Sequence, residues 1–519
     1  RLTITGDDQA NGIQSLLVTG TAVTVTPDGS TSVNGQPAGM AVTLPGAATS
    51  LTANLLGGND SLSINGSSDF ALTGAATFNL GGGNNTLNLT TTGHVTLGSL
   101  AVTSGSGSSS VTVSPGAGPG TVNGRALFSF GPGGTNTVAL SNTSFPGPAG
   151  VRVTAGISGS NVVTANNVTV ARTFSLNTGR AASTQLQTFT NDTLGGLAMT
   201  GANPSLSLTS STINGNLSEI GNLSSNCSTA NVVAVTGNVI LRSGGSAGLI
   251  TGPPLMNGTF TARNVTVSGP GVVTFFTGGT SATINGNLSV TGQGLPSIQV
   301  QTSGLTEVKG NVVEGGGSRQ TTFLTLGPFK ADRNVTVRTA PNNTIAAVII
   351  GTSTAPAAIQ GNLTVATGNG QLGMALTNVT VGGATRIMTG AGPDTLQFNA
   401  TTFQGAFTAN TGAGADTLQI DATTFQGAFT ANTGAGNDTF NIAQAAGMPA
   451  PVTFTGRVVI NAGPGNDTLR LGRSTGDANS RAVFSVPTSS LNGGPGFNTY
   501  FKSTSQVTGP ANFLNWTNA

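Results

Sequence analysis

Reactive and charged side chains are scarce in this 519-residue chain. It contains one Cys, one His, one Trp and one Tyr, and only 7% of its residues are charged, against about 25% in ordinary soluble domains. The single cysteine, Cys227, excludes an intrachain disulfide framework. No run of about 18 apolar residues occurs, so no segment can span a membrane as a helix. The formal charge of +2 is spread along the chain without a basic run, which gives nucleic-acid binding no support.

The balance of residue types also argues against helices. Glu and Lys are nearly absent, whereas Gly accounts for 79 residues and Thr, Ser, Asn and Val are abundant. This composition disfavours helices and suits strands. Apolar residues alternate with polar ones, as in Leu87-Asn88-Leu89 and Val265-Thr266-Val267, which is the period of a strand with one buried face. The regular apolar positions also argue against disorder.

One sequence occurs twice at a short interval. Residues 401–414 read TTFQGAFTANTGAG, and residues 423–436 repeat these fourteen letters 22 residues later. A unit of that length cannot bury a core of its own, so each copy must pack against its neighbours. The repeat therefore predicts a chain that coils, with each turn stacked on the one before.

The same period continues upstream in a looser form. A phrase built on Asn-Leu or Asn-Val, usually after Gly, returns at intervals of 22, 26, 23, 24, 23 and 28 residues. Its Asn residues are Asn216, Asn238, Asn264, Asn287, Asn311, Asn334 and Asn362. Irregular spacing with a recurring strand phrase suits coils whose corners accept insertions. The fold predicted is an all-β parallel β-solenoid, or β-helix, with roughly 22–24 residues per coil.

We expect one continuous solenoid with three segments that differ in their phrases. Residues 1–150 form an N-terminal segment with Gly-rich Asn/Asp turns, and residues 151–388 a central segment of Gly-Asn-Leu/Val coils. Residues 389–519 form a C-terminal segment that contains the 22-residue repeats and ends in aromatic residues.

The outer segments share a second phrase: a Gly-rich turn, then Asn or Asp, Ser or Thr, and an apolar-x-apolar strand. It occurs at 57–64, 81–87, 131–138 and 390–396, and the residues 2–11 read similarly. Glycine permits the positive φ of a tight corner, and Asn or Asp can close the turn with its side chain. Here the chain resembles the bacterial secreted β-strand-repeat proteins with degenerate haemolysin-type (RTX-like) Gly-Gly-x-Gly-x-Asp repeats. The resemblance implies an exported, cell-surface or matrix protein, and it does not imply an enzyme. A start at Arg1 rather than Met fits a processed or truncated chain without its signal peptide.

Two roles are open for the aspartates of this phrase, which are Asp394, Asp416, Asp438 and Asp467. They can close turns, or they can hold a weak calcium ion. Calcium needs six to eight oxygens, several of them anionic. The ion-binding form of the resembled repeats sets its phrase in tandem, whereas here it occurs once per coil, and Asn85 and Asn136 replace Asp at equivalent positions. Turn closure is the favoured role, and no other cofactor is expected.

The Asn residues at strand starts also have two interpretations. Several lie in Asn-x-Ser/Thr triplets, such as 264–266, 287–289 and 362–364, which are acceptors for glycosylation. Stacked Asn residues can instead hydrogen-bond from coil to coil, as amide ladders do in stacked strands. We favour the ladder, because chance alone produces such triplets in a chain this rich in Asn, Ser and Thr.

Catalysis has little support in the sequence, although β-helices include polysaccharide lyases and hydrolases. Such sites need clustered carboxylates and a basic residue. Asp7-Asp8 is the only adjacent acidic pair, and it lies in a turn phrase. Glu307, Lys309 and Glu314 form the densest mixed group, which we interpret as a solvated edge. His94 is expected on the surface in a turn, and Cys227 lacks a paired His.

The rare aromatics gather near residue 519. Tyr500, Phe501, Phe513 and Trp516 include the only Tyr and Trp of the chain. A solenoid exposes strand edges and an open core at its last coil. These aromatics either plug that coil or dock against another copy, and the latter is a head-to-tail contact that can grow into a filament.

The function expected is that of a non-enzymatic structural protein, a subunit of an extracellular fibre or cell-surface coat assembled with itself through solenoid ends. The alternative is a surface adhesin that binds glycans through one face of the solenoid. A polysaccharide lyase or hydrolase comes third.

Overall fold

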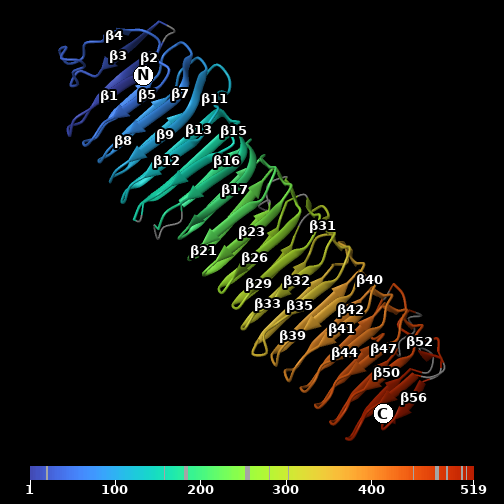
Figure 1. Ribbon diagram of the computed structural model, residues 1–519. Coiled ribbons are helices and arrows are strands. Elements are labelled where there is room, and N and C mark those ends of the chain that lie inside the picture. The colour runs from blue at the N-terminus through green and yellow to red at the C-terminus, as the bar shows by residue number, and fades with distance from the viewer. Residues whose placement is uncertain are drawn as a thin grey trace. The chain divides into compact units, whose positions relative to one another are not determined.

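The computed structural model contains β-strands and turns, and no helix, in the part of the chain that it describes. That part comprises residues 1–18, 21–156, 158–180, 185–251, 258–279, 281–301, 303–447, 449–473, 479–486, 489–503, 507–509 and 511–518. These residues therefore provide no helix with which to cross a bilayer. The chain divides into two compact units, residues 1–245 and 246–519. The fold is the predicted parallel β-solenoid, with about 24 residues per coil (Figure 1).

Each coil of the second unit contributes one strand to each of three parallel sheets. In one coil these strands are Phe407–Asn410 (β44), Thr417–Asp421 (β45) and Thr424–Phe425 (β46). Each pairs in parallel with the strand three places later, so Phe407 lies opposite Phe429 and Thr424 opposite Thr453. The first pair is 22 residues apart and the second 29, because an insertion lengthens the coil between them without breaking the pairing.

The three sheets of the second unit are defined by their strands. Sheet 1 contains β26 (Asn264–Gly269), β29 (Leu288–Gly292), β32 (Val312–Gly315), β35 (Val335–Arg338), β38 (Leu363–Ala366), β41 (Thr385–Met388), β44, β47 (Phe429–Asn432), β50 (Val458–Asn461), β53 (Ser489–Asn492) and β56 (Ala511–Leu514). Sheet 2 contains β24 (Ser246–Thr251), β27 (Val272–Thr277), β30 (Leu295–Val300), β33 (Gln320–Thr325), β36 (Ile345–Ile350), β39 (Gln371–Thr377), β42 (Thr395–Asn399), β45, β48 (Thr439–Ile442), β51 (Thr468–Leu471), β54 (Thr499–Lys502) and β57 (Thr517–Asn518). Sheet 3 contains β25 (Thr259–Ala262), β28 (Ser281–Ile284), β31 (Thr306–Val308), β34 (Phe329–Ala331), β37 (Ala357–Ile359), β40 (Val379–Val381), β43 (Thr402–Phe403), β46, β49 (Val452–Phe454), β52 (Ala482–Phe484) and β55 (Val507–Thr508). The turns from sheet 1 to sheet 2 form corner 1–2, and those from sheet 3 to sheet 1 form corner 3–1.

The first unit has the same parallel stacking, but several of its strands run through a corner and belong to two sheets. Its strands are β1 (Leu2–Thr5), β2 (Gly12–Val18), β3 (Ala22–Pro27), β4 (Val42–Pro45), β5 (Leu51–Asn54), β6 (Ser61–Ile64), β7 (Phe70–Asn79), β8 (Asn85–Leu89), β9 (Val95–Ser104), β10 (Ser109–Val113), β11 (Gly120–Val122), β12 (Ala126–Phe130), β13 (Thr135–Phe145), β14 (Val151–Thr154), β15 (Ser160–Asn177), β16 (Gln185–Thr190), β17 (Thr193–Gly201), β18 (Pro204–Thr209), β19 (Thr212–Ile213), β20 (Leu217–Gly221), β21 (Ser224–Ala230), β22 (Val232–Val235) and β23 (Asn238–Ser243). β15 is the longest and pairs with β13, β14, β16 and β17.

Three strands near the N-terminus form an antiparallel meander, although the start of β2 also pairs in parallel with β6. β2 pairs antiparallel with β3, and β3 pairs antiparallel with β4. This meander is inserted between the first two coils, so Leu2 lies opposite Leu51, 49 residues later. Leu16, Val23 and Val25 are buried within it. The sequence analysis predicts parallel coils only, and these antiparallel strands are a difference that apolar–polar alternation cannot reveal, because it is the same in both kinds of strand.

Inward-facing side chains form one apolar column in each unit, and the second unit adds an aromatic stack. Phe403, Phe425, Phe454 and Phe484 occupy equivalent positions on sheet 3, with successive ring centroids 5.0, 5.1 and 5.1 Å apart and nearly parallel planes. This spacing follows from the ~4.8 Å separation of hydrogen-bonded strands. Stacking like on like fills the core with identical shapes, which accounts for the repetition of Phe in the 22-residue repeat.

Corner 1–2 explains the Gly-rich phrase. Gly434 has a φ of +87°, and a Cβ placed there would collide with the carbonyl oxygen of Gly412, one coil earlier. Gly463 stands in the same relation to Gly434. Glycine is therefore required twice over, by the left-handed backbone and by the close approach of the neighbouring turn.

Candidate functional site

The four predicted aspartates form a ladder along corner 1–2. Each lies just before a strand of sheet 2 and accepts a hydrogen bond from the preceding coil. The N–H of Asp394 donates to Oδ1 of Asp416 at 2.8 Å, and the N–H of Asp416 donates to Oδ1 of Asp438 at 2.9 Å. Asp438 donates in the same way to Asp467 at 2.8 Å, and Asp467 to Oδ1 of Asn498 at 2.9 Å. The ladder ends on an amide, so the acceptor does not have to be charged.

The second carboxyl oxygens of this ladder are poorly satisfied. Oδ2 of Asp467 is buried and has no hydrogen-bond partner among the described residues, whereas the hydroxyls of Thr411 and Thr433 lie near the buried carboxyls of Asp416 and Asp438 and favour their charged forms. Oδ2 of Asp394 accepts a hydrogen bond from the Thr389 hydroxyl. Burial raises the pKa of Asp394 and of Asp467 to about 6, and it also raises the pKa of Asp416 and Asp438 above the usual value. An ionised form in this position is costly because few groups solvate it.

This geometry favours turn closure over calcium binding at the four aspartates. Each gives one oxygen to a backbone N–H of the preceding coil. The described residues contain no group of three or more His, Cys, Asp or Glu side chains placed to hold a metal ion. Calcium at these residues stays a prediction, and thermal unfolding in the presence of a chelator tests it.

A second ladder lies along corner 3–1, where the Asn-Leu/Val phrase predicts it. The N–H of Asn287 donates to Oδ1 of Asn264 at 2.7 Å, and the N–H of Asn311 donates to Oδ1 of Asn287 at 2.8 Å. The series continues through Asn334 and Asn362. The bonds join side-chain oxygens mainly to backbone N–H groups rather than amide to amide. A ladder of amide to amide does occur on the outer face of sheet 1, where Asn432 donates to Asn410 and Asn461 to Asn432.

Three of the four aromatics near the C-terminus pack on the core. Tyr500 lies opposite Leu469 and Phe513 opposite Leu491, both at inward positions, and their rings stack with centroids 4.5 Å apart. The indole N–H of Trp516 donates to the carbonyl oxygen of Leu491 at 3.1 Å. This packing agrees with the plug interpretation for these three residues.

Phe501 is the one predicted aromatic that faces outward. It lies opposite Arg470, whose guanidinium carbon is 5.4 Å from the ring centroid, and 42% of the residue is exposed. Phe497, which the sequence alone does not single out, is 88% exposed in the turn before β54. Leu514 of β56 is also exposed, at 51%.

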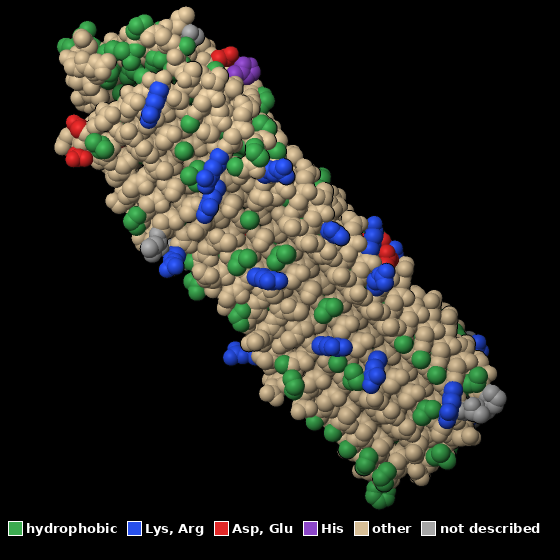
Figure 2. All heavy atoms as spheres, in the orientation of Figure 1, with side chains coloured by type: hydrophobic (Ala, Val, Ile, Leu, Met, Phe, Trp, Pro, Cys, Tyr) green, Lys and Arg blue, Asp and Glu red, His purple; other side chains and the backbone are tan. Residues whose placement is uncertain are grey.

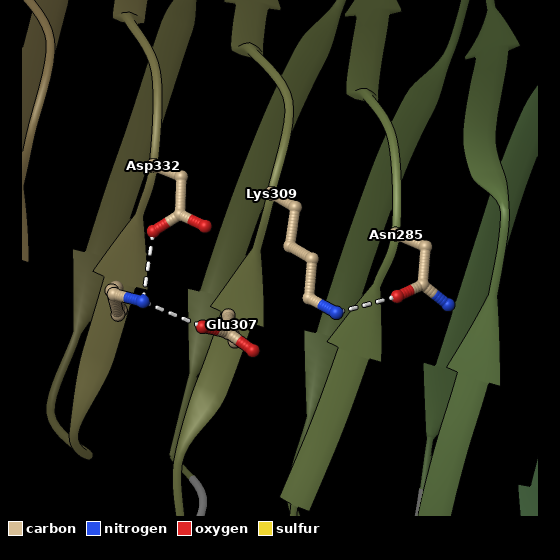
Figure 3. A network of polar contacts seen from close by, with 5 residues as sticks. Asn285, Glu307, Lys309 and Asp332 are labelled. Atoms are coloured by element: carbon tan, nitrogen blue, oxygen red, sulfur yellow. Dashed lines mark hydrogen bonds and ion pairs between the residues drawn. The ribbon is translucent and has the colours of Figure 1, made fainter.

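The mixed group Glu307, Lys309 and Glu314 is only partly a solvated edge. Nζ of Lys309 donates to Oδ1 of Asn285 at 3.0 Å, while Glu307 is bound by Lys330 at 2.7 Å (Figure 3). Lys330 also pairs with Asp332 at 2.9 Å, and these two hydrogen bonds raise the pKa of Lys330 to about 12.

Glu314 corrects that interpretation, because it does not lie at the edge. It is fully buried at an inward position of sheet 1, between Val290 and Val337 of the adjacent coils. Neither carboxyl oxygen forms a well-aligned hydrogen bond with the described residues, although the backbone at Ile298 and Thr322 lies near enough to favour the charged form slightly. Burial is the larger effect and raises the pKa of Glu314 well above its usual value. The sequence contains an indication of this burial, because aligning residues 311–314 with 287–290 places Glu314 at the position of Val290.

The first unit contains a similar buried acid, which the sequence analysis missed. Glu219 lies inward between Met199 and Leu241, and its Oε1 accepts a hydrogen bond from the Ser225 hydroxyl at 3.1 Å. Cys227 is buried nearby, and burial followed by the charge of Glu219 raises the pKa of its thiol. A buried thiol with a raised pKa is a poor nucleophile.

The remaining candidates are surface residues. Asp7 and Asp8 are exposed, and Oδ1 of Asp7 accepts the N–H of Gln9 at 2.9 Å within the turn. His94 is exposed, and its backbone N–H donates to Oδ1 of Asp69 at 2.7 Å.

Most of the acids lie inside, which the sequence does not show directly. Nine of the sixteen are buried: Asp60, Asp192, Glu219, Glu314, Asp394, Asp416, Asp421, Asp438 and Asp467. None of the 18 Lys and Arg residues is buried. Figure 2 accordingly shows Lys and Arg spread over one face with few acidic side chains. The surface is thus more cationic than the formal charge of +2 suggests.

A groove along corner 1–2 was also missed. It occupies about 590 Å³ over four successive coils that lack the aspartate ladder, and its lining includes Pro270, Thr291, Gln293, Val313 and Arg338, together with the buried Glu314. Its floor is glycine backbone at 269, 292, 315 and 316. Side chains are absent from this floor because a Cβ at 292 or 316 would meet the backbone of the preceding coil.

Comparisons with known proteins add no relative: no family model, no curated protein and no solved structure matches the chain. The chain is therefore defined by its fold, which is a parallel β-solenoid.

Proposed function

We propose that this chain is a non-enzymatic structural protein, a subunit of an extracellular fibre or cell-surface coat. The observation that carries the proposal is that the polar side chains of this chain bond successive coils to one another. Asp and Asn side chains bond one coil to the next along two corners, as do Asn residues on the outer face of sheet 1. Such stacking adds side-chain hydrogen bonds to the backbone ladder at every coil, which suits a protein selected for durability.

The burial of acids supports a role without catalysis. Glycoside cleavage uses two carboxyl groups that face one substrate. Here nine acids are buried in ladders or core, and among the described residues of the second unit the only acids that are not buried, the half-buried Glu307 and Asp332, are both paired with Lys330. The Gly-rich phrase supports a place among the bacterial secreted β-strand-repeat proteins with degenerate haemolysin-type repeats, and hence a location outside the cell.

The proposed assembly contact lies on the coil formed by β54 to β57. Phe497 and Phe501 expose aromatic surface there, and Leu514 is 51% exposed. A head-to-tail contact through this coil would join the copies into a filament.

Negative-stain microscopy tests the assembly. We expect filaments from the purified protein and none from the double variant Phe497→Ser/Phe501→Ser, with an unchanged melting temperature. The matched control is Leu223→Ser, which removes a side chain of 57% exposure from the first unit and should leave filaments intact. Single particles at every concentration would overturn the assembly proposal.

A second proposed function is that of a surface adhesin that binds glycans. Its support is the excess of exposed cations over exposed acids, which would attract an acidic polymer. Binding of an immobilised acidic polysaccharide, weakened by salt, tests it.

A further inference from the structure

We propose that the groove at corner 1–2 of the second unit binds a chain of carboxylated sugars, with Arg338 holding the carboxylate. The inference rests on the second proposed function, that the surface binds glycans, and it names the site and the substrate class.

The shape of the groove suits a sugar chain. Its volume of about 590 Å³ falls within the range of ~300–1,000 Å³ typical of ligand sites. The floor of glycine backbone at 292, 315 and 316 brings a ligand against peptide groups. The floor spans adjacent coils, since Gly315 pairs with Arg338 across β32 and β35.

The walls combine the chemistry that recognises sugars. Pro270 and Val313 offer apolar surface for the C–H face of a ring, while Thr291 and Gln293 offer hydrogen-bonding groups for hydroxyls. The groove is open at the surface and is not enclosed by any lid among the described residues, so a polymer could lie along it.

Arg338 supplies the preference for a carboxylate. It is exposed at the end of β35 and forms no ion pair with any described acid. A free guanidinium binds a carboxylate through two parallel N–H···O bonds. Arg319, also exposed, lies three residues after Gly316 in the same corner, and it adds a second positive charge.

Nearby negative charge does not compete for this arginine. In the described part of the second unit, the only acids that are not buried are the half-buried Glu307 and Asp332, on or just after strands of sheet 3, and the Glu314 that lines the groove is itself buried. Glu307 and Asp332 are both bound by Lys330 (Figure 3).

A nucleic acid fits the groove less well. Single strands are held by several phosphate contacts and by bases stacked on aromatic rings, and no aromatic side chain lines the groove. The exposed guanidinium of Arg338, with Arg319 in the same corner, suits a ligand that carries one carboxylate per sugar ring.

The test measures binding of the intact chain by isothermal titration calorimetry. The probes are an oligogalacturonate, a neutral malto-oligosaccharide of the same length, dextran sulfate and single-stranded DNA. We expect the oligogalacturonate to bind most tightly. Arg338→Gln should weaken it about tenfold or more, the loss expected for a bidentate charge-assisted pair. Val313→Trp should weaken it as well, because the indole would fill the groove from an outward position of β32.

The matched control is Arg386→Gln, which removes the same charge from β41 of the same sheet and should change affinity less than about twofold. Melting temperatures of all variants verify folding. Equal losses for Arg338→Gln and Arg386→Gln, or tighter binding of DNA or dextran sulfate than of oligogalacturonate, would overturn the assignment of this groove while leaving glycan binding by the surface intact. Absence of binding to every polysaccharide would overturn both.

Discussion

The backbone N–H of Asp416 donates to Oδ1 of Asp438, one coil further along, at 2.9 Å. One carboxyl oxygen of Asp438 therefore caps the turn of the neighbouring coil, while the other oxygen is buried. An amide serves the first purpose equally well, and this difference between Asp and Asn makes the ladder testable.

Replacing Asp467 by Asn should stabilise the protein at neutral pH and have little effect in acid. Burial raises the pKa of the Asp467 carboxyl to about 6 from an ordinary 3.8, so this carboxyl binds its proton more strongly in the folded state than in the unfolded state. The associated stability is complete below about pH 4 and is lost as the pH rises through about 6. Asn keeps the acceptor for the N–H of Asp438. We expect a gain on the order of 1 kcal/mol at about pH 7.5, after discounting for solvent screening.

Urea denaturation at both pH values measures this gain. Asp69→Asn is the control, since Asp69 also accepts a backbone N–H from the next coil but is exposed. An equal gain at both pH values, or an equal gain for Asp69→Asn, would contradict the role of burial.

Replacing Glu314 by Leu should stabilise the core. Burial raises the pKa of Glu314 well above its usual value, so the stability associated with its neutral form is present below about pH 4.5 and declines as the pH rises toward the raised pKa. Leu has a similar volume and needs no hydrogen bond, and we expect about 1–4 kcal/mol at neutral pH. Chemical denaturation of Glu314→Leu measures this gain in stability. The control variant is Glu307→Gln, because Glu307 is partly exposed. A loss of stability would show that the carboxyl has a partner.

Removing one ring from the phenylalanine stack should be costly. Phe425 stacks on Phe403 at 5.0 Å and on Phe454 at 5.1 Å, and Phe425→Ala leaves a cavity worth about 3–5 kcal/mol. Phe497→Ala, at the 88% exposed ring, should leave the melting temperature unchanged. Similar melting curves for the two variants would refute the stack as a source of stability.

Two glycines of positive φ should respond differently to alanine. Gly434 has a φ of +87°, and a Cβ there meets Gly412, whereas Gly133 has a φ of +78° with open space around its Cβ position. Gly133→Ala should cost about 1 kcal/mol from backbone strain alone. Gly434→Ala should cost clearly more, since its turn must move away from the neighbouring coil. Thermal unfolding compares them, and equal losses would contradict the close approach.

Chelation should leave stability unchanged. Each ladder aspartate already gives one oxygen to a backbone N–H, which leaves fewer than the six to eight oxygens that calcium needs. We expect the same melting temperature in EDTA and in millimolar calcium. A melting temperature that rises in calcium for the wild-type chain, but not for Asp416→Asn, would show that these aspartates bind calcium.

Much of the stacking could be predicted from repetition. The pairing of Phe407 with Phe429 follows from the repeat at 22 residues. The ladder through Asn264, Asn287 and Asn311 follows from the Asn-Leu/Val phrase. Repeats reveal such contacts because equal residues in successive coils must face equal surroundings.

The buried acids could have been found by the same alignment but were not. Glu314 and Glu219 occupy columns that hold Val290 and Leu241 in neighbouring coils. Charged residues usually face solvent, which predicts an exposed Glu314. The alternation of the strand instead turns residue 314 inward, and the alternation is correct.

The sequence by itself determined the coil, its period and the residues that stack from turn to turn, because those depend on local alternation and on repetition. Only the tertiary structure decided that β2, β3 and β4 run antiparallel, that nine acids lie inside, and that Arg338 borders a groove. These features depend on which groups from different coils meet in space, and each arises where one coil differs from its neighbours. A repeat describes what the coils share, so it cannot predict the positions at which one coil differs from its neighbours.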